Sequence, residues 1–571
     1  MPFRLSLLLL FLGGVLVPGA HGQQADTTQL PEIAPQEIQI RGERRIALPS
    51  LERQPLTGFA RPPKVPTVPP DHRPYVEPYE QELDDLPESL PLPETVAEPI
   101  APASAARQGF VEGGGGRYYS RFFEGRVLVP VSSNEHLSVH GTYTGTEGFT
   151  PFQSDSVATP SDVASAQVRF ESTRDPVQVT ALLHGSAERY TLYGVTPASE
   201  QADREGYSVG SSLQLTSRGE IPARAEVRYD RTQYTSHLQV ENTGNGADFR
   251  QGTLGLSGSV TAPVALRPHL DVAYSRSWLG GAPLEDTDSA FGFDGAGTLS
   301  LFRTDSSTVE VGARALAFDT PAQPFAPTTR HVSATFVAPV VNVEWRVAQG
   351  VTLHLRNQPR RVEASLHRLY AENPYAMHAP SLRPTLETTN AETGLTLASG
   401  PIRFVAAAGY RYAPTYRFFE PGAQGGYSDG VFRVRYGSAR ILQGRGRIAL
   451  QGVEGVQASL GASLRDGSLG DGEVIPNFAP ITADAMLTVS FAGGNGFFEI
   501  LGHYKSPRYA SRAENNRLAS YFTLDLESSY ALGSSIVLLA QAKNLAFGAP
   551  TLWSGYPRPP AQFSMGLRIR W

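Results

Sequence analysis

Apolar and polar residues alternate along most of the chain from residue 107 onwards. In residues 223–230, Ala, Ala, Val and Tyr occupy one set of alternate positions, and four charged residues occupy the other set. Successive side chains of a β-strand point to opposite faces of the sheet, so this alternation predicts strands with one apolar and one polar face. The same pattern recurs in residues 432–437, 522–527 and 563–571. Its recurrence in distant segments favours an all-β fold.

A row of charges on one face of a strand is typical of a membrane barrel. Lipid covers the apolar outer face of such a barrel, and water reaches its polar inner face. Short turns lie at one end of these barrels and long loops at the other. The chain has short breaks at 132–134 and 533–535, and long polar breaks at 146–161, 239–248 and 279–290. We therefore expect a transmembrane antiparallel β-barrel over residues 107–571, with about 22 strands and a range of roughly 16–24.

Charged residues on the polar face of the strands are candidates for lining the lumen. They would line a pore or hold another part of the chain inside the barrel. Their mixed signs favour a third arrangement, in which ion pairs between neighbouring strands stiffen the wall. The candidate lumen-lining residues are Arg224, Glu226, Arg228, Asp230, Arg433 and Arg435.

A run of glycines at residues 113–116 lies at the start of the predicted barrel. Glycine inside a strand often marks a place where two backbones approach closely. We expect this approach where the first strand meets the strand that ends at Trp571.

Residues 1–22 have the composition of a secretory signal peptide. Arg4 supplies a positive charge, residues 5–17 form a short apolar core, and Ala20 and Gly22 are small residues at the positions that a signal peptidase reads. The apolar stretch is short for a membrane anchor. These features predict export of the protein and cleavage after Gly22.

Residues 23–106 differ in composition from the predicted barrel. Sixteen prolines lie between Pro31 and Pro102, and the second half of this arm is acidic. Proline lacks a backbone donor and fixes φ, so the arm is expected to be extended and disordered. It is a spacer, a segment that contacts a periplasmic partner, or a segment that enters the barrel lumen. One proline-free stretch alternates like a strand and is a candidate for pairing with the sheet edge of another protein: Glu37, Ile38, Gln39, Ile40 and Arg41.

Composition and motifs give no indication of an enzyme. The chain has no cysteine and a formal net charge of -6, which argues against thiolate chemistry and against nucleic-acid binding. Neither a Gly-x-Ser-x-Gly elbow nor a His-Glu-x-x-His helix is present. The histidines that lie nearest one another in sequence, His354, His367 and His378, do not have the spacing of a metal site. We expect no catalytic residue, no resident metal and no cofactor.

The last hundred residues contain several aromatic motifs. These are YKSPRY at 504–509, YFTLDL at 521–526, KNL at 543–545, WSGYPRPP at 553–560 and MGLRIRW at 565–571, with LYAENPY upstream at 369–375. Together they resemble the C-terminal part of the barrel of TonB-dependent receptors, and the resemblance covers residues 107–571.

The resemblance implies a barrel of about 22 strands in the bacterial outer membrane. It also implies insertion by the barrel-assembly machinery, with the aromatic terminal strand as the signal. The signal residues would be Phe563, Met565, Leu567, Ile569 and Trp571. Receptors of this family carry a TonB box and a folded plug before the barrel. Residues 37–41 resemble such a box, whereas the proline-rich arm is too short and too broken to form the plug.

These expectations lead to one main hypothesis about function and two alternatives. The main hypothesis is a receptor or transport component for uptake across the outer membrane. The alternatives are a passive porin-like channel, and a structural or assembly barrel that tethers periplasmic proteins through its arm. The expected partners are outer-membrane lipid, the barrel-assembly machinery, and a TonB-like or other periplasmic protein bound by residues 23–106.

Overall fold

The computed structural model describes most of the predicted barrel. The described residues are 109–151, 158–194, 203–237, 247–281, 284–322, 330–377, 382–424, 427–513, 516–545 and 551–571. The predicted signal peptide, the predicted arm with its box-like residues 37–41, and His378 lie outside the described residues. No described helix is both long and apolar enough to cross a membrane.

The described strands form one antiparallel sheet of 22 strands. The first half comprises β1 (Gly109–Gly116), β2 (Arg121–Ser132), β3 (Glu135–Thr146), β4 (Ser161–Arg174), β5 (Val177–Thr191), β6 (Asp203–Ser217), β7 (Ala223–Ser236), β8 (Ala247–Thr261), β9 (His269–Gly281), β10 (Leu284–Arg303) and β11 (Ser307–Pro321). The second half comprises β12 (His331–Ala348), β13 (Val351–Asn357), β16 (Thr389–Ser399), β17 (Ile402–Gln424), β18 (Tyr427–Val453), β19 (Val456–Leu469), β20 (Ile481–Phe491), β21 (Gly496–Lys505), β24 (Tyr521–Ala531), β25 (Ile536–Lys543) and β28 (Gln562–Arg570).

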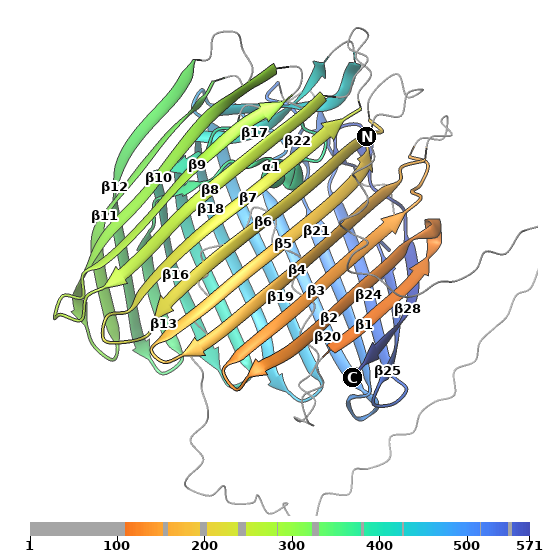
Figure 1. Ribbon diagram of the computed structural model, residues 1–571, viewed down its shortest axis with the longest axis horizontal. Helices are drawn as coiled ribbons and strands as arrows, with labels where there is room; N and C mark the ends of the chain where they lie inside the picture. Colours follow the sequence, from red (N-terminus) through yellow and green to blue (C-terminus); the bar gives the residue numbers. More distant parts are fainter. Residues whose placement is uncertain are drawn as a thin grey trace, which may run out of the picture. The chain divides into compact units, whose positions relative to one another are not determined.

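Each strand pairs with the next along this order, and β28 returns to pair with β1. Figure 1 shows this closure, with orange β1 beside blue β28. Because the sheet has no free edge, it is a closed barrel. The predicted all-β antiparallel barrel of about 22 strands is confirmed.

The two ends of the barrel differ in the length of their connections. At one end, short turns such as 133–134 and 349–350 join neighbouring strands. At the other end, the connections include residues 358–388 between β13 and β16 and residues 544–561 between β25 and β28. The long break expected at 279–290 is wrong, because β9 continues to Gly281 and β10 begins at Leu284.

Short elements occur within the long connections. These are the helix α1 (Leu366–Glu372), the hairpin of β14 (Arg360–Val362) and β15 (Thr385–Glu387), the hairpin of β22 (Arg508–Tyr509) and β23 (Arg517–Leu518), and the hairpin of β26 (Thr551–Trp553) and β27 (Tyr556–Pro557). Single 3-10 turns occur at Arg117–Tyr119 and Ala492–Gly494.

The outer face of the wall is apolar. On β28 and at the chain end, Phe563, Met565, Leu567, Ile569 and Trp571 are between 48% and 72% exposed, and polar or small residues alternate with them. Large exposed apolar side chains also lie on most other barrel strands. Such a continuous apolar surface requires lipid around it. The predicted location in the bacterial outer membrane follows from this architecture.

The seam between β1 and β28 is packed closely, as the glycine run predicts. Gly114 lies opposite Gly566, and a Cβ atom on Gly114 would overlap the carbonyl oxygen of Met565. Inside the barrel, Arg568 Nε donates to Glu112 Oε2 at 2.5 Å and joins the first strand to the last.

Candidate functional site

A segment at the long-loop end of the barrel, residues 358–377 and 382–388, leaves the wall after β13 and returns to it at β16; we call it the cross-mouth segment. Its helix α1 begins after Ser365, whose hydroxyl accepts a hydrogen bond from the Arg368 backbone N–H at 3.2 Å. Leu366, Leu369 and Tyr370 recur at three- and four-residue intervals and are buried, so one face of the helix packs against other parts of the mouth.

One side of the cross-mouth segment is bound to strands β5 and β6. The Pro374 carbonyl oxygen accepts hydrogen bonds from Tyr190 Oη at 3.0 Å and from Arg204 Nη1 at 2.6 Å. Arg204 is fully buried, donates a second bond to Ser236 Oγ at 2.9 Å, and lies over the Tyr370 ring at 4.4 Å. A buried arginine with these partners fixes the segment firmly to this wall.

The other side of the same segment is bound to β18. The Phe432 backbone N–H donates to the Tyr375 carbonyl oxygen at 3.0 Å, and the Met377 N–H donates to the Phe432 carbonyl oxygen at 2.8 Å. Pro374 and Tyr375 are adjacent in the chain, so this part of β18 lies close to β5 and β6, although β18 is the sixteenth strand of 22 and β5 the fifth. The end of the β17–β18 hairpin therefore leans over the mouth, and the segment itself reaches from β13 and β16 to β5 and β6. Together they cover part of the mouth of the barrel.

A third part of the chain, the β26–β27 hairpin, packs onto the cross-mouth segment at Tyr375. The ring of Tyr556 stacks on that of Tyr375 with 3.4 Å between centroids, and Tyr193 meets Tyr556 edge-on at 4.9 Å. Tyr193 Oη donates to the Pro557 carbonyl oxygen at 2.8 Å. Burial raises the pKa of Tyr193 to about 12 and that of Tyr375 well above its ordinary value, so both phenols stay neutral.

The resulting cluster is buried and mostly apolar. Its residues come from several barrel strands, from the β26–β27 hairpin and from the cross-mouth segment. Its members are Tyr234, Phe249, Leu279, Leu366, Leu369, Tyr370, Ala376, Leu382, Phe419, Phe432, Val434 and Tyr556. Apolar constrictions exclude water and hence ions. The cluster forms a buried apolar core over part of the mouth.

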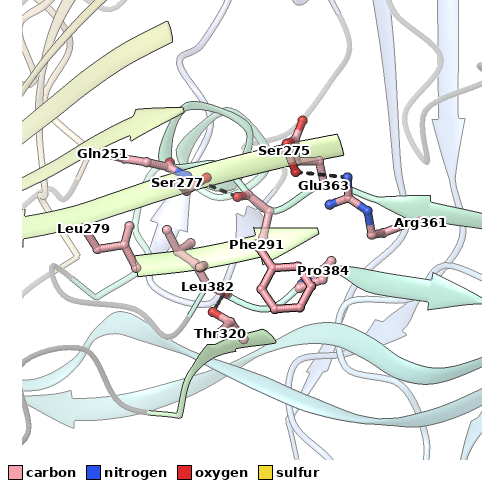
Figure 2. Close-up of a pocket in the computed structure, with 12 residues that line it drawn as sticks. Gln251, Ser275, Ser277, Leu279, Phe291, Thr320, Arg361, Glu363, Leu382 and Pro384 are labelled. Carbon is pink, nitrogen blue, oxygen red and sulfur yellow. Dashed lines mark hydrogen bonds between the residues drawn. The ribbon is translucent and has the colours of Figure 1, made fainter. Parts of the chain in front are cut away.

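A small cavity of about 30 Å³ lies between the cross-mouth segment and the wall strands β8–β11. Figure 2 shows Arg361 of β14 reaching toward Ser275 of β9, to which its Nη2 donates at 3.0 Å. Glu363 lines the same cavity and accepts a bond from Arg228 Nη2 at 3.1 Å. Burial lowers the pKa of the Arg361 guanidinium. The cavity combines these charged groups with apolar side chains such as Leu279 and Phe291.

The predicted lumen charges on β7 take part in ion pairs. Arg224 pairs with Glu226 at 3.0 Å, and Arg228 pairs with Asp230 at 2.6 Å. Asp230 also lies 3.3 Å from His184 Nε2 on β5. The Arg224–Glu226 and Arg228–Asp230 pairs lie within β7, and Arg228 extends the network to the cross-mouth segment through Glu363.

On β18 the arrangement differs from the one expected. Phe432 and Val434 do not face lipid but pack into the mouth cluster, so Arg433 and Arg435 lie on the opposite face of the strand. Arg435 Nε is 3.6 Å from Glu420 Oε2. The physical reason is that this part of β18 lies beyond the ladder to β19, which begins at Ala439, and pairs with β17 and, at Phe432, with the cross-mouth segment. Its apolar face turns to the mouth there.

Sequence reasoning did not find the residues that hold the mouth, namely Arg204, Tyr375 and Tyr556. Their partners lie more than a hundred residues away in sequence, and alternation assigns a face but no partner. Two of the aromatic motifs contain these residues, since LYAENPY includes Tyr375 and WSGYPRPP includes Tyr556, but neither motif indicates a partner.

Comparisons with known proteins agree with this architecture. No family model and no curated protein sequence matches the chain. Among solved structures, the FrpB iron transporter from Neisseria meningitidis (F3-3 variant) is 13% identical, with 82% of each chain covered and a TM-score of 0.63. The copper transporter OprC is 13% identical, with 82% and 80% covered and a TM-score of 0.61. The siderophore receptor PirA from Acinetobacter baumannii is 12% identical, with 82% and 81% covered and a TM-score of 0.61.

These likenesses define the fold class of the protein. It is a 22-stranded barrel like those of outer-membrane TonB-dependent transporters, as the terminal motifs predict. At these identities the likeness concerns the fold, and the solute has to be argued from this chain's own residues.

Proposed function

We propose that the protein is a receptor or transport component for uptake across the outer membrane, with an entrance that is held closed at rest. The observation that carries this proposal is the cross-mouth segment, which is hydrogen-bonded to Arg204 on the wall and to Phe432 on the β17–β18 hairpin that leans over the mouth. The likeness to iron, copper and siderophore proteins supports the assignment to uptake.

The composition of the mouth favours a gated entrance over a passive porin-like channel. A passive pore conducts best when its narrowest part is polar and wet, whereas leucine, phenylalanine and tyrosine side chains meet here. Release of the segment from one wall would open the mouth without breaking a strand ladder of the barrel.

Single-channel conductance of the purified full-length protein in planar bilayers tests the proposal. We expect the unmodified protein to show little steady conductance. Replacing residues 363–384 by Asn-Gly removes the bridge and closes the β14–β15 ladder, which ends at Val362 and Thr385, with a two-residue hairpin turn. This variant should show a large, steady conductance.

Two further results decide between the alternatives. A large, steady conductance of the unmodified protein would overturn the closed-entrance proposal in favour of a passive pore. A lack of conductance in the 363–384 variant, with and without residues 23–106, would leave only the structural or assembly barrel. Retention of heat-modifiable mobility in gel electrophoresis shows that each variant still forms a barrel.

We also propose that residues 37–41 engage a TonB-like periplasmic protein by adding a strand to its sheet. Site-specific crosslinking from this stretch in cells should capture such a partner. Changing Ile38→Pro and Ile40→Pro removes two backbone donors and should abolish the crosslink. Matched changes Ile46→Pro and Leu51→Pro in the same arm should leave it. If no partner is captured, the proposal fails.

A further inference from the structure

Four basic side chains gather near the mouth on the side of the barrel formed by β19, β20, β21 and β24. They are Arg465 of β19, Lys505 at the end of β21, Arg508 of β22 and Arg558, which follows β27. The strand register brings Lys505 opposite both Thr482 and Tyr521. The charges of Arg465, Arg508 and Arg558 all act on that of Lys505.

The positive charge of this group is not balanced by nearby carboxylates. Within the part of the chain that the structure describes, none of the four basic residues forms an ion pair. The carboxylate that acts on Lys505 is that of Asp484, and its Oδ1 lies 2.5 Å from His503 Nδ1. Like charges held close together in a partly buried site cost free energy unless an anion joins them.

Two of the arginines also present buried nitrogen atoms without a protein partner. Arg508 is 4% exposed, and its Nη2 donates to the carbonyl oxygens of Thr551 at 3.1 Å and Leu552 at 2.5 Å. Arg508 Nη1 and Arg465 Nε are buried and have no hydrogen-bond partner among the described residues. A buried donor without an acceptor is costly, which indicates that an acceptor from outside the chain belongs here.

Aromatic rings hold the guanidinium groups in place. Arg508 and Arg558 lie 5.5 Å and 5.6 Å from the centroid of the Tyr521 ring, and Arg465 lies 4.6 Å from that of Phe478. Stacking of this kind orients the planar donor fork and limits the entropy lost when a ligand binds. The group is therefore organised before any ligand arrives.

We propose that Arg465, Lys505, Arg508 and Arg558 form a binding site for a small solute that carries a multiply charged oxyanion group, a phosphate or several carboxylates. Guanidinium groups bind both with paired hydrogen bonds, and an ammonium group adds a point charge. The binding site itself does not depend on the proposed uptake function. The further step, that the bound solute is also the transported one, rests on that function.

Equilibrium binding to the full-length protein in detergent tests the site at constant ionic strength. The probes are inorganic pyrophosphate and citrate, with chloride as the reference anion, and isothermal titration calorimetry measures affinity. We expect saturable binding of at least one of the two probes. Lys505→Gln and Arg558→Gln should each weaken that binding about tenfold, or by about 1.4 kcal/mol, because each removes a charged donor.

The matched control is Arg447→Gln on β18, whose Nη2 donates to Ser459 Oγ and which lies outside this group. It should leave the affinity unchanged. Absence of saturable binding for both probes, or equal affinity in the Lys505, Arg558 and control variants, would overturn the site. Preference for pyrophosphate or for citrate identifies the chemistry of the anion. Binding is measured without transport, so a freely conducting barrel that still binds its probe would reject the closed entrance and keep this site.

Discussion

The barrel wall and the cross-mouth segment are stabilised in different ways. In the wall, each strand is joined to the next by a continuous backbone ladder, such as the fourteen register pairs between β6 and β7. Between its roots at Gln358 and Thr388, which bond to the backbone of β16 and β17, the cross-mouth segment has a short backbone pairing with Phe432. Side chains such as Arg204 and Tyr556 hold it elsewhere. Backbone ladders tolerate many sequences, whereas side-chain contacts of this kind depend on individual residues. Changes in the two regions should therefore have separable effects.

The largest expected effect comes from the seam of the wall. Gly114→Val places a side chain against the Met565 backbone and the Phe122 ring, where no space exists. We expect loss of nearly all folded barrel, because β1 and β28 could no longer pair. Heat-modifiable mobility of the outer-membrane fraction measures this loss. Gly446→Val is the control, since a Cβ at Gly446 meets nothing within 4 Å. Equal folding of both variants would contradict the account of the seam.

A smaller effect is expected from Arg204→Met, which keeps much of the side-chain volume but removes the bonds to Pro374 and Ser236. The closed mouth should lose about 1–3 kcal/mol, so the open fraction should rise about tenfold while the barrel stays folded. Single-channel recording measures the open fraction. Arg224→Met, which removes an exposed ion pair with Glu226, should change it little. If both variants behave alike, Arg204 does not hold the segment.

The smallest effect concerns alkaline pH. Burial raises the pKa of Tyr193 to about 12 in the closed mouth, so the neutral phenol is favoured there. The closed arrangement is fully stable below a pH of about 10, the ordinary pKa of tyrosine, and loses stability as the pH rises toward the raised value. Conductance should therefore increase in this window.

Tyr193→Phe sharpens the alkaline prediction. It removes one titrating group, so the increase should begin at higher pH, and it removes the bond to Pro557, which costs about 1 kcal/mol at neutral pH. Tyr229→Phe on the lipid-facing side of β7 serves as the control and should leave the onset unchanged. Tyrosinate absorbance follows the titration. An onset that does not move in Tyr193→Phe would show that this phenol is not linked to closure.

The wall could be predicted from the sequence because its rule is local. Alternation with a period of two places Phe563 and Met565 outside without any knowledge of their neighbours. The same rule failed at 279–290, where polar composition suggested a loop. Polar residues are equally compatible with a strand of a barrel, because one face of such a strand is wet.

The mouth could not be predicted in this way. Alternation treats Arg204 like any charge on an inner face, although it is fully buried beneath Tyr370. Pro374 lies 170 residues further along the chain, and no periodicity links the two positions. Beyond the ladder to β19, the apolar face of β18 packs into the mouth cluster. The direction in which Arg433 points is therefore set by tertiary contacts, which alternation does not predict.

The seam determines where the chain of this barrel can be cut and rejoined. Gly109 and Trp571 exchange two backbone hydrogen bonds, of 3.3 Å and 3.1 Å, at the short-turn end. In a closed sheet the β1–β28 pair is equivalent to any other neighbouring pair. A short linker from Trp571 to Gly109 would therefore act as one more short turn. A circularly permuted barrel, opened instead at the Ser133-Asn134 turn, would keep every ladder and the cross-mouth segment. It would also move the attachment point of residues 23–106 from the start of β1 to the start of β3, two strands along the wall.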